Sequence, residues 1–287
     1  MSRSEHPTVG AVTGVLEETY PLAWAEPWDR VGLVLGERAA EVHRVLLAVD
    51  PTVAVAREAV ERDAQLVITH HPLLLRGASF LPADDGKGAV VTALLRHGTA
   101  LWGGHTNVDR SSRGTVGAWI DLLDLQGVAP LVPGASESDG TAAAHGSRRI
   151  GLGAVGTLPA PTTIGDLTEA LSHLVPATAR GILHTGDPDR MVRTLAVCPG
   201  AGDSFLGAAS AAGVDAYITS DLRHHPALEH LESAADPSRV PALIDVPHAA
   251  SEALWLPLAQ QLLHETMPEL EVLRSTHRSD PWNGRAG

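Results

Sequence analysis

The 287-residue sequence is poor in cysteine and in aromatic residues, with one Cys, two Phe and two Tyr. A single cysteine, Cys198, excludes a disulfide within the chain. No apolar run approaches the roughly 18 to 20 residues that cross a bilayer, and no apolar segment of a secretory signal peptide follows the first residues. These absences predict a cytoplasmic protein with no membrane partner.

Basic residues are also scarce. The sequence has 21 Lys and Arg against 34 Asp and Glu, so the formal net charge is −13. An acidic protein repels the phosphate backbone of a long nucleic acid, so we expect no extended DNA or RNA partner. A small anionic substrate would need local positive charge, which bound metal ions can supply.

The length suits two domains of about 100 to 150 residues, each with its own core. We predict a first α/β domain over residues 1–130 and a second over residues 150–287. Residues 131–149 contain Pro, Gly, Ser and few large apolar side chains, which is typical of a linker or mobile loop.

Apolar strands alternate with helical patterns in both halves. In the first half we predict strands at residues 45–49, 66–69 and 99–102, separated by helices. In the second half a helix is expected at residues 164–174, and strands are expected at 194–198, 215–219 and 243–246. Alternation of this kind predicts an α/β fold with largely parallel strands. Both halves reach a polar loop containing His-His-Pro, a weak sign of internal duplication.

Histidine is abundant, with 15 residues, and three segments place it just after an expected strand, two of them together with an acid. The edge beyond the carboxyl ends of parallel strands is where open α/β sheets bind ligands. The three segments are His70-His71, His105 with Asp109 four residues later, and His248 with Glu252 at helical i,i+4 spacing.

Each segment alone has a purely structural interpretation. The His pair can cap its strand, His105 and Asp109 can stabilise a turn, and His248 with Glu252 can be a surface pair. Together they supply imidazole and carboxylate ligands of the kind that Zn, Fe or Mn ions accept. Five or six such ligands exceed one tetrahedral site, so we predict two divalent ions about 3.5 to 4 Å apart.

Two further motifs are ambiguous. His225 and Asp221 follow the expected strand at residues 215–219 and either carry protons for the site or stabilise a turn. The stretch from Pro199 to Ser204 is rich in glycine but lacks the third Gly of a dinucleotide fingerprint and the Lys of a P-loop. It is interpreted first as a tight turn from a strand to a helix.

The motifs occur in a recognisable order over nearly the whole chain. They are Trp28-Asp29-Arg30-Val31-Gly32-Leu33, Ile68-Thr69-His70-His71-Pro72-Leu73, His105-Thr106-Asn107-Val108-Asp109, Tyr217-Ile218-Thr219-Ser220-Asp221 and Asp245-Val246-Pro247-His248 with Ser251-Glu252. This set resembles the short form of the Nif-three-like family, which is also described as type-two GTP cyclohydrolase-like and as dinuclear metal centre hexameric proteins.

The resemblance implies two similar, interlocked α/β domains with the metal site between them, assembled as a toroidal homohexamer. By position, the residues that match the family's metal ligands are His70, His71, Asp109, His248 and Glu252. His105 matches a histidine that lines the site. The chain departs from the family pattern at Arg30 and at Gly117-Ala118.

Our leading hypothesis is a metal-dependent hydrolase that acts on a small, nucleotide-like substrate, with GTP cyclohydrolase-like chemistry implied by the resemblance. His105 and His225 are the candidate catalytic proton carriers. The competing hypothesis is a metal-binding or regulatory assembly protein without enzymatic activity.

Overall fold

The computed structural model describes residues 6–133 and 142–286. The chain divides into two compact units, which are described separately. Unit 1 comprises residues 1–108, 142–147 and 255–279, and unit 2 comprises residues 109–141, 148–254 and 280–287. In the described ranges, no helix combines the length and the apolar character that a membrane span requires.

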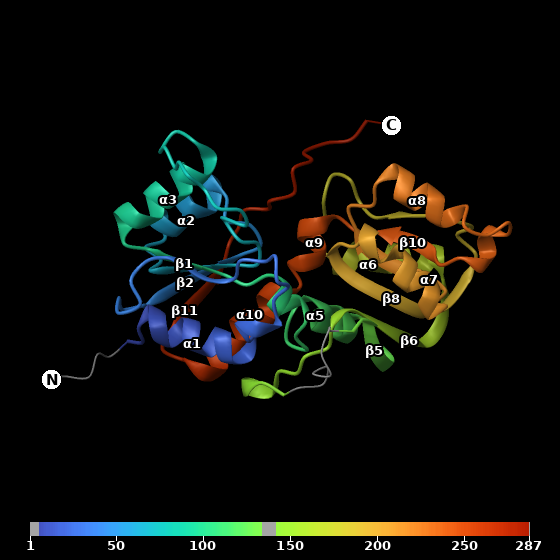
Figure 1. The fold of residues 1–287 in the computed structure, drawn as a ribbon, viewed down its shortest axis with the longest axis horizontal. Coiled ribbons are helices and arrows are strands. Elements are labelled where there is room, and N and C mark those ends of the chain that lie inside the picture. Colours follow the sequence, from blue (N-terminus) through green and yellow to red (C-terminus); the bar gives the residue numbers. More distant parts are fainter. Residues whose placement is uncertain (1–5, 134–141, 287) are drawn as a thin grey trace. The chain divides into compact units, whose positions relative to one another are not determined.

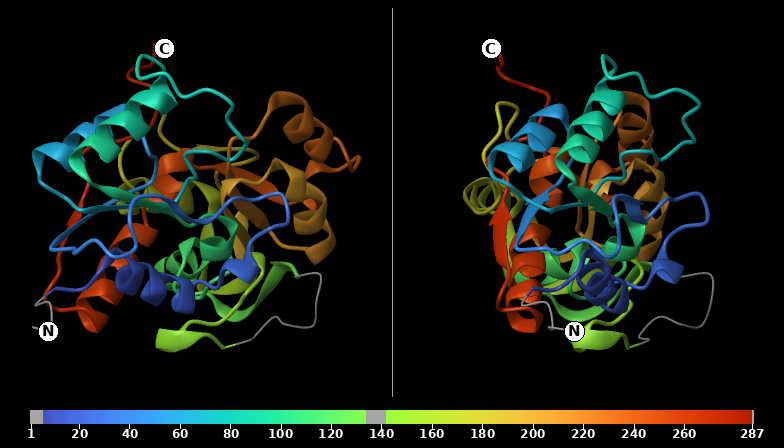
Figure 2. Two further views of the ribbon diagram at one scale, coloured as in Figure 1. Left: turned by 60° about the vertical axis from the view of Figure 1, so that its left-hand side comes forward. Right: turned by 90° about the vertical axis from the view of Figure 1, so that its left-hand side faces the viewer.

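Unit 1 is built on one mixed sheet. Its strands are β1 (Gly32–Leu35), β2 (Arg44–Ala48), β3 (Leu66–Thr69), β4 (Ala100–Gly103) and β11 (Glu271–Arg274). The strand order is β1-β4-β3-β2-β11, and only β1 runs antiparallel to its neighbour. Strand β11 pairs with β2 although more than 200 residues separate them, and Figure 2 shows it in red beside the blue strands.

Helices cover both faces of this sheet because its strands are apolar on both sides. Val45 and Leu47 of β2 face one hydrophobic cluster, and Leu46 and Ala48 face another. The first cluster includes α1 (Val9–Thr19) and α10 (Trp255–Thr266), and the second includes α2 (Val53–Glu61) and α3 (Gly86–His97). Figure 1 shows the two pairs on opposite faces. Unit 1 is therefore a three-layer α/β/α structure.

Side chains fix where two of these helices begin. Thr8 accepts a hydrogen bond from the backbone N–H of Ala11 at the start of α1, and Thr52 caps α2 in the same way through Val55. Shorter helical segments of unit 1 are Leu22–Trp24 and Ala144–Gly146, and the one-turn helix α4 (Thr106–Asp109) ends at the first residue of unit 2.

Unit 2 contains a six-stranded sheet with a parallel centre. Its strands are β5 (Gln126–Val132), β6 (Leu152–Thr163), β7 (Leu183–His184), β8 (Met191–Ala201), β9 (Ala216–Ser220) and β10 (Ala242–Asp245). The order is β5-β6-β8-β9-β10-β7. Strands β8, β9 and β10 are mutually parallel, whereas β5, β6 and β7 pair antiparallel.

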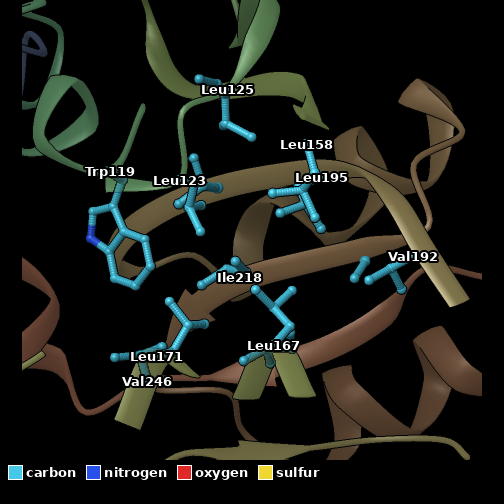
Figure 3. Packing of buried hydrophobic residues seen from close by; sticks show 14 of the residues in the cluster. Trp119, Leu123, Leu125, Leu158, Leu167, Leu171, Val192, Leu195, Ile218 and Val246 are labelled. Atoms are coloured by element: carbon cyan, nitrogen blue, oxygen red, sulfur yellow. The ribbon is translucent and has the colours of Figure 1, made fainter. Parts of the chain in front are cut away.

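The two faces of the second sheet are also covered. Helices α5 (Thr115–Leu122) and α6 (Ile164–Leu174) pack on one face, and α7 (Leu206–Ala212) and α8 (His224–Leu231) pack on the other. Figure 3 shows Trp119 of α5 and Leu171 of α6 near Ile218 of β9. Helix α9 (His248–Glu252) follows β10, and short turns lie at Asp203–Phe205 and Pro237–Arg239.

The α/β class with largely parallel strands is confirmed by the two sheets. The compact units divide the chain differently from the boundaries expected at residues 130 and 150. The chain leaves unit 1 after Val108, and residues 255–279 return to it because β11 completes the first sheet. Of the expected linker, residues 134–141 lie outside the described residues.

A buried carboxylate holds the returning segment in place. Glu58 of α2 accepts hydrogen bonds from Ser275 Oγ and from the N–H and Oγ1 of Thr276, and it pairs with Arg62 at 3.0 Å. Burial alone would raise the pKa of Glu58, but these hydrogen bonds and Arg62 bring it below the usual value. The ionised carboxylate is therefore part of the folded structure.

We expect Glu58→Ala to reduce the free energy of unfolding by about 2 kcal/mol at neutral pH, because it leaves several donors without a charged acceptor. Urea denaturation measures the loss. A depressed pKa stabilises the fold above the unfolded value of about 4.3, so the difference should shrink as pH falls through the folded pKa. Glu61→Ala, on the exposed side of the same helix, is the control. Equal stability of the two variants would contradict this role.

Candidate metal centre

Three imidazoles converge in unit 1. His70 and His71 directly follow β3, and His105 directly precedes α4. The ring centroids are 5.1 Å apart for His70 and His71, 5.4 Å for His70 and His105, and 5.5 Å for His71 and His105. One nitrogen from each ring lies within 4.8 Å of the others. This spacing allows all three to bind the same metal ion.

The backbone around these histidines is fixed by neighbouring strands. The N–H groups of His70 and His71 both donate to the carbonyl of Val49, at 3.1 and 2.9 Å. On the other side, Gly104 donates to the carbonyl of Thr69 at 3.0 Å. A Cβ on Gly104 would lie 2.3 Å from the Trp102 ring, so only glycine fits before His105. The histidine loops are thus set by the sheet.

Two aspartates contact the histidines of unit 1. Asp50 Oδ1 lies 2.7 Å from Nδ1 of His71, and Asp29 Oδ1 lies 2.9 Å from Nδ1 of His105. Asp29 is buried and also accepts hydrogen bonds from the N–H and Oγ1 of Thr106. Burial would raise the pKa of Asp29, but the hydrogen bonds from His105 and Thr106 hold it far below its usual range.

Unit 2 provides a histidine and a glutamate on one face of α9. His248 Nε2 lies 2.9 Å from Glu252 Oε1, as the i,i+4 spacing predicts for a helix. The other ring nitrogen, Nδ1, lies 2.7 Å from Asp221 Oδ2. Asp221 has a left-handed backbone with φ of 56°, a conformation that Asp tolerates better than most residues.

Ser251 connects α9 to its surroundings. Its hydroxyl accepts hydrogen bonds from the N–H of Gly200 and from Ser220 Oγ, and its carbonyl accepts one from Trp119 Nε1. Gly200, in the glycine-rich turn of β8, has φ of +72°, and a Cβ there would lie 2.4 Å from Glu252 Oε1. That turn is therefore packed directly against the Glu252 carboxylate.

Asp109 is the last residue of α4 and accepts a hydrogen bond from Thr115 Oγ1. Burial, together with the charges of Asp109 and Glu252, raises the pKa of the Cys198 thiol to about 12. Both carboxylates therefore act on one buried thiol within unit 2. In the metal-free protein Cys198 is therefore a protonated thiol at neutral pH.

The predicted site residues thus fall into two groups. Unit 1 brings together His70, His71 and His105, and unit 2 brings His248 next to Glu252. His225 is an exposed residue of α8 whose ring meets that of His224 at 5.1 Å, and its catalytic role stays a prediction.

Four residues were not identified as functional from the sequence: Asp29, Asp50, Gly200 and Ser251. Each acts through a contact with a residue at least 21 positions away. The sequence shows Asp50 before Pro51 and Asp29 after Trp28, but local sequence does not indicate which histidine each of these acids contacts. Tertiary structure alone identifies these partners.

The donors suit a metal ion. Imidazole nitrogens clustered within 4.8 Å, with carboxylates on Nδ1 of His71 and His105, match the ligand chemistry of zinc, iron and manganese. The histidine and glutamate groups could therefore hold a metal ion.

A family model described as Duf34/NIF3 (NGG1p interacting factor 3) matches residues 7–281. The chain belongs to this family. A relative from Streptomyces coelicolor named GTP cyclohydrolase 1 type 2 homolog is 42% identical over 280 residues, with 96% of this chain and 94% of the relative covered. The Duf34/NIF3 assignment confirms the family resemblance drawn from the motifs.

Other Duf34/NIF3 proteins differ from this chain in length but share its fold. A Mycobacterium leprae relative with the same name is 32% identical over 369 aligned residues, covering 95% of this chain and 94% of the relative. Because 369 exceeds the 287 residues of this chain, that relative contains residues that the short form lacks. A Bacillus cereus protein related to NIF3 shares the fold, with a TM-score of 0.83, 21% identity and coverage of 97% and 99% of the two chains.

The contact between Gly200 and Glu252 predicts a strong effect of a single methyl group. Gly200→Ala should displace the Glu252 carboxylate and add backbone strain of about 1 kcal/mol at positive φ. We expect lower thermal stability in calorimetry and weaker divalent metal binding in competition with a chelator. Gly207→Ala, in α7 with open space around it, is the matched control. Indistinguishable results for the two variants would refute the steric interpretation.

Proposed function

We propose that this Duf34/NIF3 protein is a metal-dependent hydrolase acting on a small, nucleotide-like substrate. The observation that carries the proposal is the convergence of three histidine rings beyond the carboxyl ends of β3 and β4. Ligand and catalytic sites of open α/β sheets are concentrated at that edge. The name of the relatives, GTP cyclohydrolase 1 type 2 homolog, agrees with a guanine nucleotide as one substrate to test.

We propose that five residues hold two divalent ions: His70, His71, Asp109, His248 and Glu252. Two of these residues lie next to positions where the chain passes from one unit to the other. Asp109 is the first residue after the chain leaves unit 1, four positions from His105, and the chain returns to unit 1 at Trp255, three positions after Glu252.

Bound divalent ions of this type supply Lewis acidity and neutralise developing negative charge. The chain supplies the proton carriers of the proposal. His105 holds its Nδ1 against the buried Asp29 carboxylate, which keeps the ring in one orientation. His225 is proposed as a second carrier, on an exposed turn of α8.

An exposed tryptophan supports an aromatic substrate. Trp28 is 54% exposed, and its ring contacts the edge of His105 with a centroid distance of 5.9 Å. Exposed aromatic rings beside a polar site commonly stack with nucleobases. A base placed on Trp28 would bring the rest of the nucleotide towards the histidines of unit 1.

The function is tested with purified protein loaded with zinc, iron or manganese, its metal content measured by elemental analysis. Assayed against GTP and a panel of cyclic and phosphorylated nucleotides, it should show metal-dependent turnover. His71→Ala and Glu252→Gln should lose turnover at least tenfold and bind less metal, because each removes one proposed ligand.

His173→Ala removes an exposed histidine of α6 and is the control, with turnover and metal content expected at the original level. A fully loaded protein with no turnover on any substrate would instead support the non-enzymatic role as a metal-binding or regulatory protein. Unchanged metal content in Glu252→Gln would show that Glu252 is not a ligand.

Loss of the stacking surface should raise KM more than it changes kcat. Trp28→Ala should raise the KM for a purine nucleotide about tenfold, since stacking contributes about 1 to 3 kcal/mol per base. Steady-state kinetics measure the change, and Trp282→Ala, which removes another exposed tryptophan, is the matched control. A KM equal in both variants would argue against base stacking on Trp28.

We further propose, from the family resemblance, that the chain works as a cytoplasmic homohexamer. Light scattering on the purified protein measures the mass directly.

A further inference from the structure

We propose that three aspartates are positioning residues of the metal centre, each fixing one histidine through its Nδ1 atom. The pairs are Asp50 with His71, Asp29 with His105, and Asp221 with His248. In the Asp50 and Asp221 pairs the aspartate determines that Nε2 is the nitrogen presented to a metal ion, and in the Asp29 pair it leaves Nε2 of His105 as the nitrogen that exchanges a proton. The inference rests on the metal-binding part of the proposed function.

Hydrogen-bond chemistry determines which ring nitrogen carries the proton. An ionised carboxylate has acceptor atoms only, so a ring nitrogen bonded to it must carry the proton. A neutral imidazole with the proton on Nδ1 has its lone pair on Nε2, and metal binding requires that lone pair. Partner carboxylates of this kind orient metal-binding histidines in many proteins.

In unit 1 the sheet itself builds the first pair. Strands β2 and β3 run parallel, with Ala48 opposite Thr69, so residues two positions further on meet at the same sheet edge. Those residues are Asp50 and His71, which lie 2.7 Å apart. The second oxygen of Asp50 accepts a hydrogen bond from Ser279 Oγ, which fixes the carboxylate in turn.

Unit 2 repeats the arrangement with different strands. Strands β9 and β10 run parallel, with Thr219 opposite Asp245; Asp221 follows β9, and His248 begins helix α9 after β10. Here the orientation of Nε2 is directly visible, because it lies 2.9 Å from Glu252 Oε1 while Nδ1 faces Asp221. Asp221 and the proposed ligand Glu252 therefore lie on opposite sides of the His248 ring.

The third pair has another origin, since Asp29 lies in the loop before β1. Its carboxylate is held by the N–H and Oγ1 of Thr106 and by the N–H of Arg30, and its Oδ1 lies 2.9 Å from His105 Nδ1. The same bonding pattern thus arises at three separate places in the chain. Repetition at three histidines, each contacted through Nδ1, favours a common role over three accidental contacts.

The first test needs no metal. Protein labelled with ¹⁵N-histidine and stripped of metal is studied by long-range proton–nitrogen correlation. His71 and His105 should show the proton on Nδ1, and Asp50→Asn should shift only His71 towards the Nε2–H form, because an amide can donate as well as accept. His248 is not assigned in this metal-free measurement, because its Nε2 also faces a carboxylate, that of Glu252. Wild-type rings protonated on Nε2 would overturn the assignment.

The second test measures zinc affinity by competition with a chelator. Asp50→Asn and Asp221→Asn should each weaken zinc binding about 10- to 100-fold with little change in thermal unfolding. Asp84→Asn and Asp121→Asn are exposed controls, one in each unit. Asp29→Asn is left out of this comparison because it also disturbs the buried bonds with Thr106.

The outcomes separate this inference from the proposed function. Zinc affinity in both Asn variants within about twofold of wild type would refute the positioning role, whatever the protein hydrolyses. Weakened zinc binding in a protein that hydrolyses no tested nucleotide would leave the positioning role intact and refute only the proposed hydrolase.

Discussion

Parallel pairing of neighbouring strands is the constraint on which the candidate centre depends. Because parallel strands end at the same edge of a sheet, the residues that follow them meet there. The register of β2 with β3 brings Asp50 to His71, and the register of β9 with β10 brings Asp221 to His248. A slip of one residue in either pair would turn these side chains to opposite faces.

The sheets must also keep the polar groups fixed among apolar layers. His70 is fully buried and contacts the Trp255 ring, and Asp29 is buried with each oxygen hydrogen-bonded. A buried carboxylate without such partners would destabilise the fold, whereas a hydrogen-bonded one is a rigid acceptor. Glycines at positions 104 and 200 let the backbone approach where any side chain would collide.

Elements that depend on local pattern were predictable. The strand expected at residues 66–69 is β3, and the helix expected at 164–174 is α6. Both predictions succeeded because an apolar run and a helical apolar periodicity can be recognised within a short stretch of sequence. The candidate ligands were predictable for a related reason, since each follows such a strand. Family motifs then selected five of them.

Long-range contacts were not predictable in the same way. Strand β11 joins the first sheet beside β2, so residues 255–279 belong to unit 1, against the expected boundary at residue 150. Its short apolar pattern, Val272-Leu273 between Glu271 and Arg274, does not specify a partner strand. The contact of Asp29 with His105 joins residues 76 positions apart, and nothing local distinguishes Asp29 from other acids in loops.

The acid–histidine pairs would also let an acidic chain hold a metal ion selectively. With a net charge of −13, exposed carboxylates are plentiful, and alone they attract any cation weakly. Carboxylates placed behind imidazoles act differently: they raise the basicity of the ring and orient it, so the metal meets nitrogen donors in a fixed geometry. That arrangement favours transition metals over magnesium or calcium, which prefer oxygen ligands. The same device serves a hydrolase and a metal-holding protein alike, which is why the function must be argued from the substrate side of the site, where Trp28 stands beside His105.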